Sequence, residues 1–266
     1  MKFGIILFNH SKFIVFCLIF SLSTIAWGQQ AEFVWSEENE TGSRIILSVY
    51  QNGVWQPGEN IVEDENWNLL PTLGADSKNH KLAVWSMVKD ERSILKYSIE
   101  RDGQWQAAQV LTDQMTTNLA PVVVFDNKDI CWVFWSANNG DDDDIYMSTL
   151  TTGKWTPPVR VNDDNNGPDI LPEAGLDDAG NVWVSWQTLT GDGYVSVSKS
   201  FSASDKKTNR ISNSMNIQQI EQLKSRSKSD QSMQPPAFFK SLGRATFYFP
   251  GDRKRPTRSV NGNLGS

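Results

Sequence analysis

Four series of residues recur every 50 or 51 positions through the middle of this 266-residue chain. Because different residue types keep the same interval, we predict that the chain builds one supersecondary unit several times over. The series are Trp35, Trp85, Trp135 and Trp186; Trp55, Trp105 and Trp155; Pro71, Pro121 and Pro172; and Ser48, Ser98, Ser148 and Ser198.

Each unit carries the pattern of short β-strands, which we name A to D. In one unit, residues 121–126, 131–136 and 145–148 are rich in β-branched and aromatic side chains. Gly153 then marks a turn before Trp155. Four strands in about 50 residues are typical of a propeller blade, which stacks on its neighbours to bury both faces. We therefore predict an all-β fold, a partial β-propeller of about three and a half four-stranded blades with the recurring tryptophans in its core.

The first 28 residues are predicted to be a cleaved signal peptide. An apolar run follows two lysines, and the small residues Ala26 and Gly28 precede the expected cleavage point at Gln29. The alternative is a membrane anchor, but the uncharged stretch 13–27 is shorter than the roughly 20 residues of a spanning helix. We expect a secreted or periplasmic protein with no membrane insertion after cleavage.

The repeats occupy residues 29–204, and residues 205–266 differ from them in composition. This tail holds 12 Lys and Arg against 4 Asp and Glu and is rich in Ser, Asn and Gln. Such low hydrophobicity predicts a low-complexity basic tail that is largely disordered. Two candidate elements lie in it, a helix over 217–224 and a strand over 245–249. The alternative is that the tail pairs with acidic residues of the repeats or of a partner.

The blade pattern resembles the sialidase-like β-propellers, the superfamily of bacterial neuraminidase repeats. The pattern is Pro-x4-Asp, Trp-x2-Trp-Ser, Ile-Tyr-x-Ser and Gly-x-Trp, and it covers roughly residues 33–200. The Asp-box of that family reads Ser-x-Asp-x-Gly-x-x-Trp on the C–D turn. Here the turn from Ser98 to Trp105 keeps the serine, the glycine and the tryptophan but displaces the aspartate, so the repeats are degenerate.

For a catalytic member, the resemblance implies an arginine triad that holds the substrate carboxylate, a Tyr–Glu nucleophile pair and an aspartate that acts as the acid. The expected setting of the first arginine, Phe-Arg-Ile-Pro, does not occur; the repeats offer Arg44, Arg92, Arg101 and Arg160. A serine triad would need His80, which we interpret as a solvated turn residue, and we interpret Cys131 as an inert buried thiol. A two-carboxylate glycosidase stays open, because nothing in one sequence excludes it.

Residues 29–204 hold 27 Asp and Glu against 11 Lys and Arg. In a blade, the B–C and D–A connections emerge on one rim, and here they collect most of these acids. We call the acids within 37–40, 63–65, 90–91, 113, 141–144, 163–169 and 192 the acidic rim. A negative surface keeps a protein soluble and disfavours binding of nucleic acid. The alternative role of the acidic rim is binding of calcium, which prefers carboxylate ligands in loops. The candidate calcium ligands are Asp141, Asp142, Asp143, Asp144, Asp163 and Asp169.

Trp67 breaks the repeat in a D–A connection, where other units have Thr117 and Pro168. An aromatic ring beside Asn66 and Asn68 can stack on a sugar while the amides bond its hydroxyl groups. Trp67, Asn66 and Asn68 are therefore the candidate ligand-binding residues. The alternative is that the Trp67 ring folds back on its blade.

We expect an exported, non-catalytic propeller that binds a carbohydrate or protein ligand through its acidic rim. The alternative function is a sialidase-type glycoside hydrolase, degraded or truncated. The predicted strands are too few for a closed ring, which would leave apolar sheet faces exposed. Three outcomes relieve this: tail strands such as 247–249 fill the gap, chains form a homo-oligomer that closes the ring, or the product is a poorly folded fragment.

Overall fold

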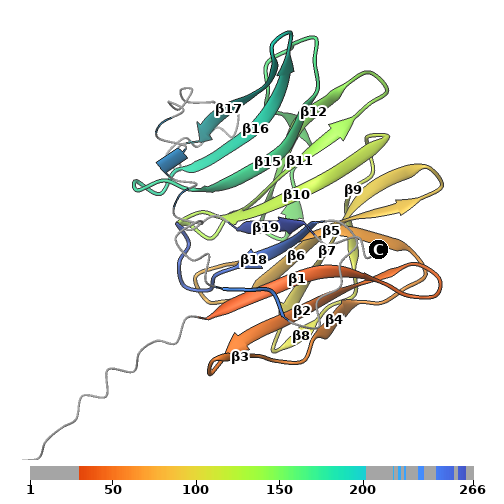
Figure 1. Cartoon of the computed structure of the whole chain (residues 1–266), viewed down its shortest axis with the longest axis vertical. Helices are drawn as coiled ribbons and strands as arrows, with labels where there is room; N and C mark the ends of the chain where they lie inside the picture. Colours follow the sequence, from red (N-terminus) through yellow and green to blue (C-terminus); the bar gives the residue numbers. More distant parts are fainter. Residues whose placement is uncertain are drawn as a thin grey trace, which may run out of the picture.

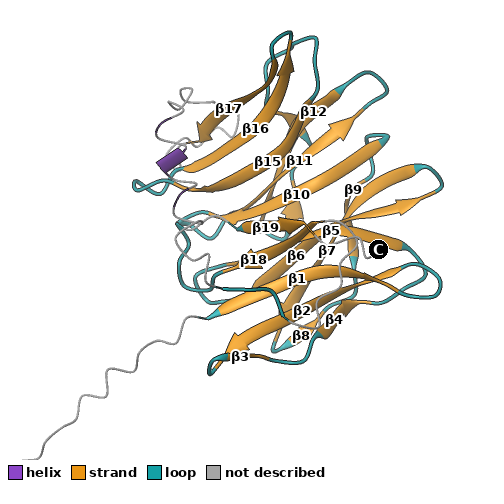
Figure 2. Cartoon of the chain, viewed as in Figure 1, coloured by secondary structure: helices purple, strands orange, loops and turns teal. Residues whose placement is uncertain are grey.

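The computed structural model describes residues 30–201, 218, 221–222, 225, 233–236, 244–254 and 257–261. In this part of the chain the regular structure is almost entirely β-strand, arranged in four antiparallel sheets (Figure 2). Gln218, Glu221 and Gln222, inside the predicted helix 217–224, are helical. The predicted signal peptide lies outside the described residues, and within them no helix has the length and apolarity needed to cross a membrane.

Three sheets are built from consecutive segments, and each is a propeller blade. The predicted strands and the partial-propeller fold are thus confirmed, and in blades 2 and 3 strand D consists of two short segments that both pair with strand C. Blade 2 comprises β5 (Trp67–Ala75), β6 (Lys81–Lys89), β7 (Arg92–Arg101), β8 (Gln104–Trp105) and β9 (Gln109–Thr112). Blade 3 comprises β10 (Thr117–Phe125), β11 (Cys131–Asn138), β12 (Asp143–Thr151), β13 (Lys154–Trp155) and β14 (Val159–Arg160). Blade 4 comprises β15 (Asp169–Leu176), β16 (Val182–Thr190) and β17 (Gly193–Phe201).

Blade 1 combines the two ends of the chain. Its segments are β1 (Ala31–Glu38), β2 (Ser43–Gln51), β3 (Val54–Trp55) and β4 (Glu59–Val62), and β18 (Arg244–Tyr248) supplies strand A with β19 (Arg258–Asn261) beside it. Strand β18 is antiparallel to β1, with Phe247 opposite Phe33. Figure 1 shows β18 and β19, in blue, between β1 and β10.

The tail therefore supplies strand A of the first sheet, while the fourth sheet has three strands in the described residues, so closure of the ring by the tail stays a prediction. The candidate strand over 245–249 is confirmed as β18, and residues 258–261 of the tail form a second strand. The physical reason is burial: Ala245 and Phe247 alternate with polar residues and face the core of blade 1. Thr246 adds a hydrogen bond from its Oγ1 to the carbonyl oxygen of Pro71 in blade 2 (2.9 Å).

The recurring tryptophans of strand B, Trp35, Trp85, Trp135 and Trp186, are buried in the core, as predicted, and the indole N–H of each donates to a side chain of its own blade. The partner in blades 2 to 4 is the polar residue at the start of strand A, itself fully buried. The bonds join Trp85 Nε1 to Asn68 Oδ1 (2.7 Å), Trp135 Nε1 to Asn118 Oδ1 (3.0 Å) and Trp186 Nε1 to Asp169 Oδ1 (2.7 Å).

The serine and proline series also have local causes. Ser48, Ser98 and Ser148 each donate a hydrogen bond from strand C to a carbonyl oxygen just after strand D's tryptophan, at 2.6 to 2.7 Å. Each proline follows a residue with positive φ where strand A bulges out of register with strand B. Because proline has no N–H for the ladder, a bulge is where a strand tolerates it.

Candidate functional site

Trp67 is the first residue of β5 and pairs with Val88 of β6, so it belongs to the sheet rather than to the D–A loop. The residue is nevertheless 42% exposed. Among the tryptophans in the described part of the chain it is the one that is exposed, since the others are buried or half-buried.

The exposed indole borders a surface depression of about 540 Å³. One wall is formed by the residues that lead into β5, and the other by the end of β6 and its hairpin turn; the lining residues are Glu65, Asn66, Trp67, Val88, Lys89 and Asp90. Asp90 and Glu91 both have positive φ, which gives the two-residue turn that projects this hairpin. The depression therefore combines one apolar ring with charged and amide groups on the acidic rim.

The predicted ligand-binding residues divide into two groups. Trp67 and Asn66 line the depression, but Asn68 is fully buried. The Asn68 side chain accepts from Trp85 and donates its Nδ2 to the Ser43 carbonyl oxygen of blade 1 (2.9 Å). Asn68 therefore joins two blades and does not face a ligand, which corrects its assignment. The sequence signal for this role was the polar residue at the equivalent position of the next two blades, Asn118 and Asp169, at intervals of 50 and 51 residues.

Asp64 holds the segment that leads into the depression. Burial alone would raise the pKa of its carboxyl group, but hydrogen bonds from the Asn68 side chain (2.8 Å) and the Asn66 backbone amide (3.0 Å) lower it. The carboxylate is therefore charged at neutral pH, and it fixes the backbone of Asn66 directly before Trp67.

The candidate calcium ligands make hydrogen bonds and ion pairs within the fold. Asp144 accepts from Asn162 Nδ2 (2.7 Å) and pairs with Arg160 (3.3 Å), and Asp163 pairs with Lys199 (2.9 Å). Asp169 is fully buried, which corrects the expectation that it lies in an exposed loop. Its carboxylate holds Trp186 and accepts from Asn162 Nδ2 (2.6 Å).

Asp142 directly precedes β12 and Asp143 is its first residue, and the pKa of each carboxyl group is raised, by burial first and then by neighbouring carboxylates. Within the described residues, no three His, Cys, Asp or Glu side chains are grouped so that they could hold a metal ion. Calcium binding by Asp141 to Asp144 stays a prediction from the sequence.

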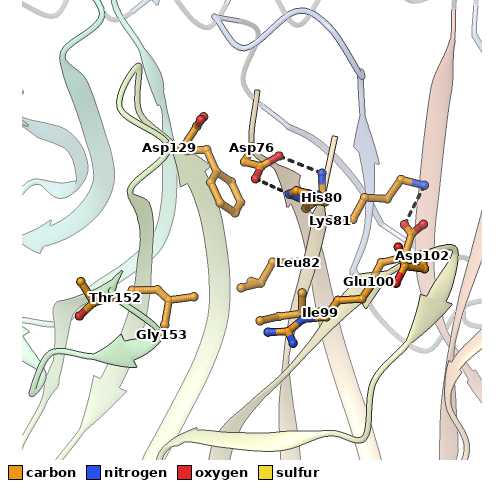
Figure 3. Close-up of a pocket in the computed structure, with 13 residues that line it drawn as sticks. Asp76, His80, Lys81, Leu82, Ile99, Glu100, Asp102, Asp129, Thr152 and Gly153 are labelled. Atoms are coloured by element: carbon orange, nitrogen blue, oxygen red, sulfur yellow. Dashed lines mark hydrogen bonds and ion pairs between the residues drawn. The ribbon is translucent and has the colours of Figure 1, made fainter. Parts of the chain in front are cut away.

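The opposite rim, formed by the A–B and C–D turns, carries a cavity of about 540 Å³ between blades 2 and 3 (Figure 3). His80 lies at its edge with its side chain 58% exposed, as expected of a turn residue, and its Nδ1 is 2.8 Å from Asp76 Oδ2. The nearby Ser77 donates to Asp129 instead (2.6 Å), so His80 and Ser77 do not form a nucleophile pair. Sequence reasoning examined His80 alone and missed this cavity.

The remaining candidates for catalysis are dispersed. Cys131 is buried, and burial raises the pKa of its thiol well above the ordinary value, as expected for an inert thiol. Arg92 and Arg101 stand at opposite ends of β7, Arg44 pairs with Glu37 in blade 1, and Arg160 belongs to blade 3.

No protein-family model and no curated protein matches the sequence. Among solved structures, an α-L-arabinofuranosidase from Fusarium graminearum, in complex with an iminosugar inhibitor, has a TM-score of 0.52 and 12% identity, covering 84% of this chain and 72% of that one. A protein of unknown function from Dyadobacter fermentans has a TM-score of 0.50 and 12% identity, covering 85% and 66%.

An α-L-arabinofuranosidase from Podospora anserina in complex with cellotriose has a TM-score of 0.45 and 12% identity, covering 65% of this chain. The present chain spans 60% of that protein's length. At these identities, the likeness to the Fusarium enzyme shows a shared fold alone, and the propeller is thus a fold that this chain has in common with glycoside hydrolases.

Proposed function

We propose that this protein is an exported propeller that binds a carbohydrate at the depression beside Trp67 and does not cleave it. The observation that carries the proposal is the exposure of Trp67, whose ring borders a depression lined by amide and charged groups. Sugars present a flat C–H face that packs on an aromatic ring, while their hydroxyl groups bond to polar side chains at its edge.

The chemistry of the depression suits a neutral or basic sugar. Asn66, Lys89 and the carboxylates of Glu65 and Asp90 supply both donors and acceptors within one small surface. Because the surrounding rim is strongly acidic, an anionic sugar such as a sialoside would meet repulsion there. The fold shared with an arabinofuranosidase supports a carbohydrate as the ligand class.

The arrangement of arginines argues against hydrolysis of the sialidase type. A sialidase-type site needs three arginines around one carboxylate, and the four arginines of the repeats lie in three different blades or at opposite strand ends. Two of them are held by acids of their own blades, Arg44 by Glu37 (3.2 Å) and Arg160 by Asp144. The apolar run and small residues of 1–28 support export.

The test is calorimetric titration with arabino-oligosaccharides, xylo-oligosaccharides and sialyllactose. Trp67→Ala should weaken binding of the preferred neutral sugar by about tenfold or more, because truncating a central aromatic costs about 2 kcal/mol. Trp67→Phe should retain most of the affinity, since a ring remains. Val110→Ala, which removes another exposed apolar side chain of blade 2, is the matched control.

Two results would overturn the proposal. One is unchanged affinity in Trp67→Ala. The other is turnover of a fluorogenic sialoside or arabinofuranoside by the wild-type protein, which would favour a glycoside hydrolase; loss of that turnover on substitution of Arg92 or Arg101 would indicate the sialidase type.

A further inference from the structure

One position of strand B differs between blades in a way that opens space. Leu82 lies opposite Gly74 of strand A, and the equivalent pairs are Trp132 with Val124 and Trp183 with Gly175. Blades 3 and 4 thus place an indole where blade 2 places an isobutyl group. The next blade packs against this position, so the exchange changes the interface between blades 2 and 3.

Blade 3 shows what the indole does at this position. The ring of Trp132 packs against Phe134 and Phe201, with centroids 6.3 and 5.4 Å away. Its Nε1 donates a hydrogen bond to Oδ2 of Asp126 (3.1 Å), the first residue of the A–B turn. In blade 3, Trp132 therefore supplies both an aromatic ring and an N–H donor beside the carboxylate of Asp126.

Blade 2 keeps the carboxylate but lacks the ring. Asp76 occupies the position of Asp126, and its Oδ2 accepts from His80 instead of from an indole. Burial would raise the pKa of Asp76, but hydrogen bonds from the amides of His80 and Lys78 and from the His80 ring lower it. Asp76 is thus a charged group at the edge of unfilled space.

That space is the cavity of about 540 Å³ between blades 2 and 3, a volume within the range of small-ligand sites. Its floor is apolar and comes from both blades, and its rim is formed by the C–D turns at Asp102 and Gly153 (Figure 3). The floor residues are Leu82, Ile99, Phe125 and Leu150.

The charged residues around the cavity carry an excess of negative charge. The lining includes four carboxylates, those of Asp76, Glu100, Asp102 and Asp129, against the cations Lys81 and Arg101. The Nζ of Lys81 lies 2.9 Å from Glu32 and 3.2 Å from Glu100, and Asp129 pairs with Arg253 (2.6 Å). Glu100 and Asp129 are therefore already paired, and Asp76 and Asp102 supply the negative charge that a ligand would meet. An apolar floor under a negative rim favours a cation with an apolar body.

We propose that this cavity is a second binding site, for a small planar aromatic cation. The ring of the ligand takes the space that Trp132 fills one blade later, and its ammonium group meets the carboxylates of Asp76 and Asp102. The proposal is independent of the sugar site, which lies on the opposite rim.

The experiment is calorimetric titration of the full chain with three probes of one shape. Tryptamine carries a cation, indole is neutral, and indole-3-acetate is an anion. We expect tryptamine to bind about tenfold more tightly than indole, with indole-3-acetate weakest. His80 and His10 are the two histidines of the chain, so a His80→Asn variant assigns the His80 ring resonance, which should shift with tryptamine.

Two variants separate the cavity from other surfaces. Leu82→Trp copies blades 3 and 4 and should abolish tryptamine binding while the melting temperature is kept or raised. Asp102→Asn keeps the turn, since asparagine tolerates its positive φ, and should reduce the preference of tryptamine over indole. Asp113→Asn, on the acidic rim, is the charge-matched control and should change nothing.

The proposal is wrong if the three probes bind alike or if folded Leu82→Trp binds tryptamine as the wild type does. If Leu82→Trp does not fold, Asp102→Asn and the His80 shift decide: an unchanged preference and an unmoved resonance refute the site.

Discussion

Removing one phenyl ring from the tail tests whether the two ends of the chain form a single cooperative blade. Phe247 of β18 is fully buried, and its ring centroid lies 4.5 Å from that of Phe33 in β1 and 6.0 Å from that of Trp55. The substitution Phe247→Ala leaves a cavity at the junction of chain ends that are more than 200 residues apart in sequence.

The expected cost follows from burial and ring contacts. Truncating a buried phenylalanine to alanine destabilises a protein by about 3–5 kcal/mol. Domains are typically stable by only about 5–15 kcal/mol, so the variant should lose a large part of its stability. The melting temperature should fall by roughly 10 °C, since 1 kcal/mol corresponds to about 2–4 °C in a domain of this size.

Urea denaturation followed by tryptophan fluorescence measures the effect. The midpoint should drop while the slope stays constant, because the same surface is exposed on unfolding. Ser259→Ala, at an exposed position of β19, is the control and should stay within about 0.5 kcal/mol of the wild type. A loss below about 1 kcal/mol in Phe247→Ala would refute the argument that β18 completes the first blade. Equally contrary would be a stable, cooperative monomer lacking residues 205–266 in analytical ultracentrifugation.

Three further outcomes are expected. Thr152→Asn should stabilise the protein by about 0.5–1 kcal/mol in thermal melts, because Thr152 has positive φ in a turn where its repeat equivalents are Asn52 and Asp102; a destabilised variant would contradict this. Asp76→Asn should be destabilised at neutral pH, because the lowered pKa of Asp76 contributes its full stability above the ordinary value of 3.8 and loses it as pH falls from there through the folded-state pKa. The difference from the wild type in denaturation midpoint should therefore shrink below pH 3.8, and a constant difference would show that the charge is irrelevant. If Asp141 to Asp144 bind calcium, millimolar calcium should stabilise the protein by about 1–3 kcal/mol over chelator, and equal melting temperatures would return these acids to a role in solubility.

The repeat architecture was predictable because its causes are local. The tryptophans, serines and prolines keep their interval because each makes the same contact within its own blade, as with Ser98 and the carbonyl oxygen of Gln106. The pairing of β18 with β1 was harder, because an apolar strand over 245–249 has no local feature that selects its partner. A strand contributed by the tail was one of the three outcomes expected, and the long-range burial of Phe247 stabilises its pairing with β1.

The site could be predicted only in part. Trp67 stood out because it breaks the repeat, and the structure places it on the acidic rim beside a depression. Asn68 was misassigned, because its neighbours suggested a loop while its repeat equivalents, Asn118 and Asp169, indicated a role in the core. The cavity between blades 2 and 3 depends on Leu82, which stands where blades 3 and 4 have Trp132 and Trp183. This difference between the repeats is visible when their sequences are aligned residue by residue.

The most direct test of the proposed function is a crystal structure of the protein soaked with the oligosaccharide that binds most tightly in titration. The account predicts a sugar ring stacked on the exposed face of Trp67, with its hydroxyl groups near Asn66, Lys89 or Asp90. A sugar bound anywhere else on the propeller, with the depression beside Trp67 free of ligand, would contradict it.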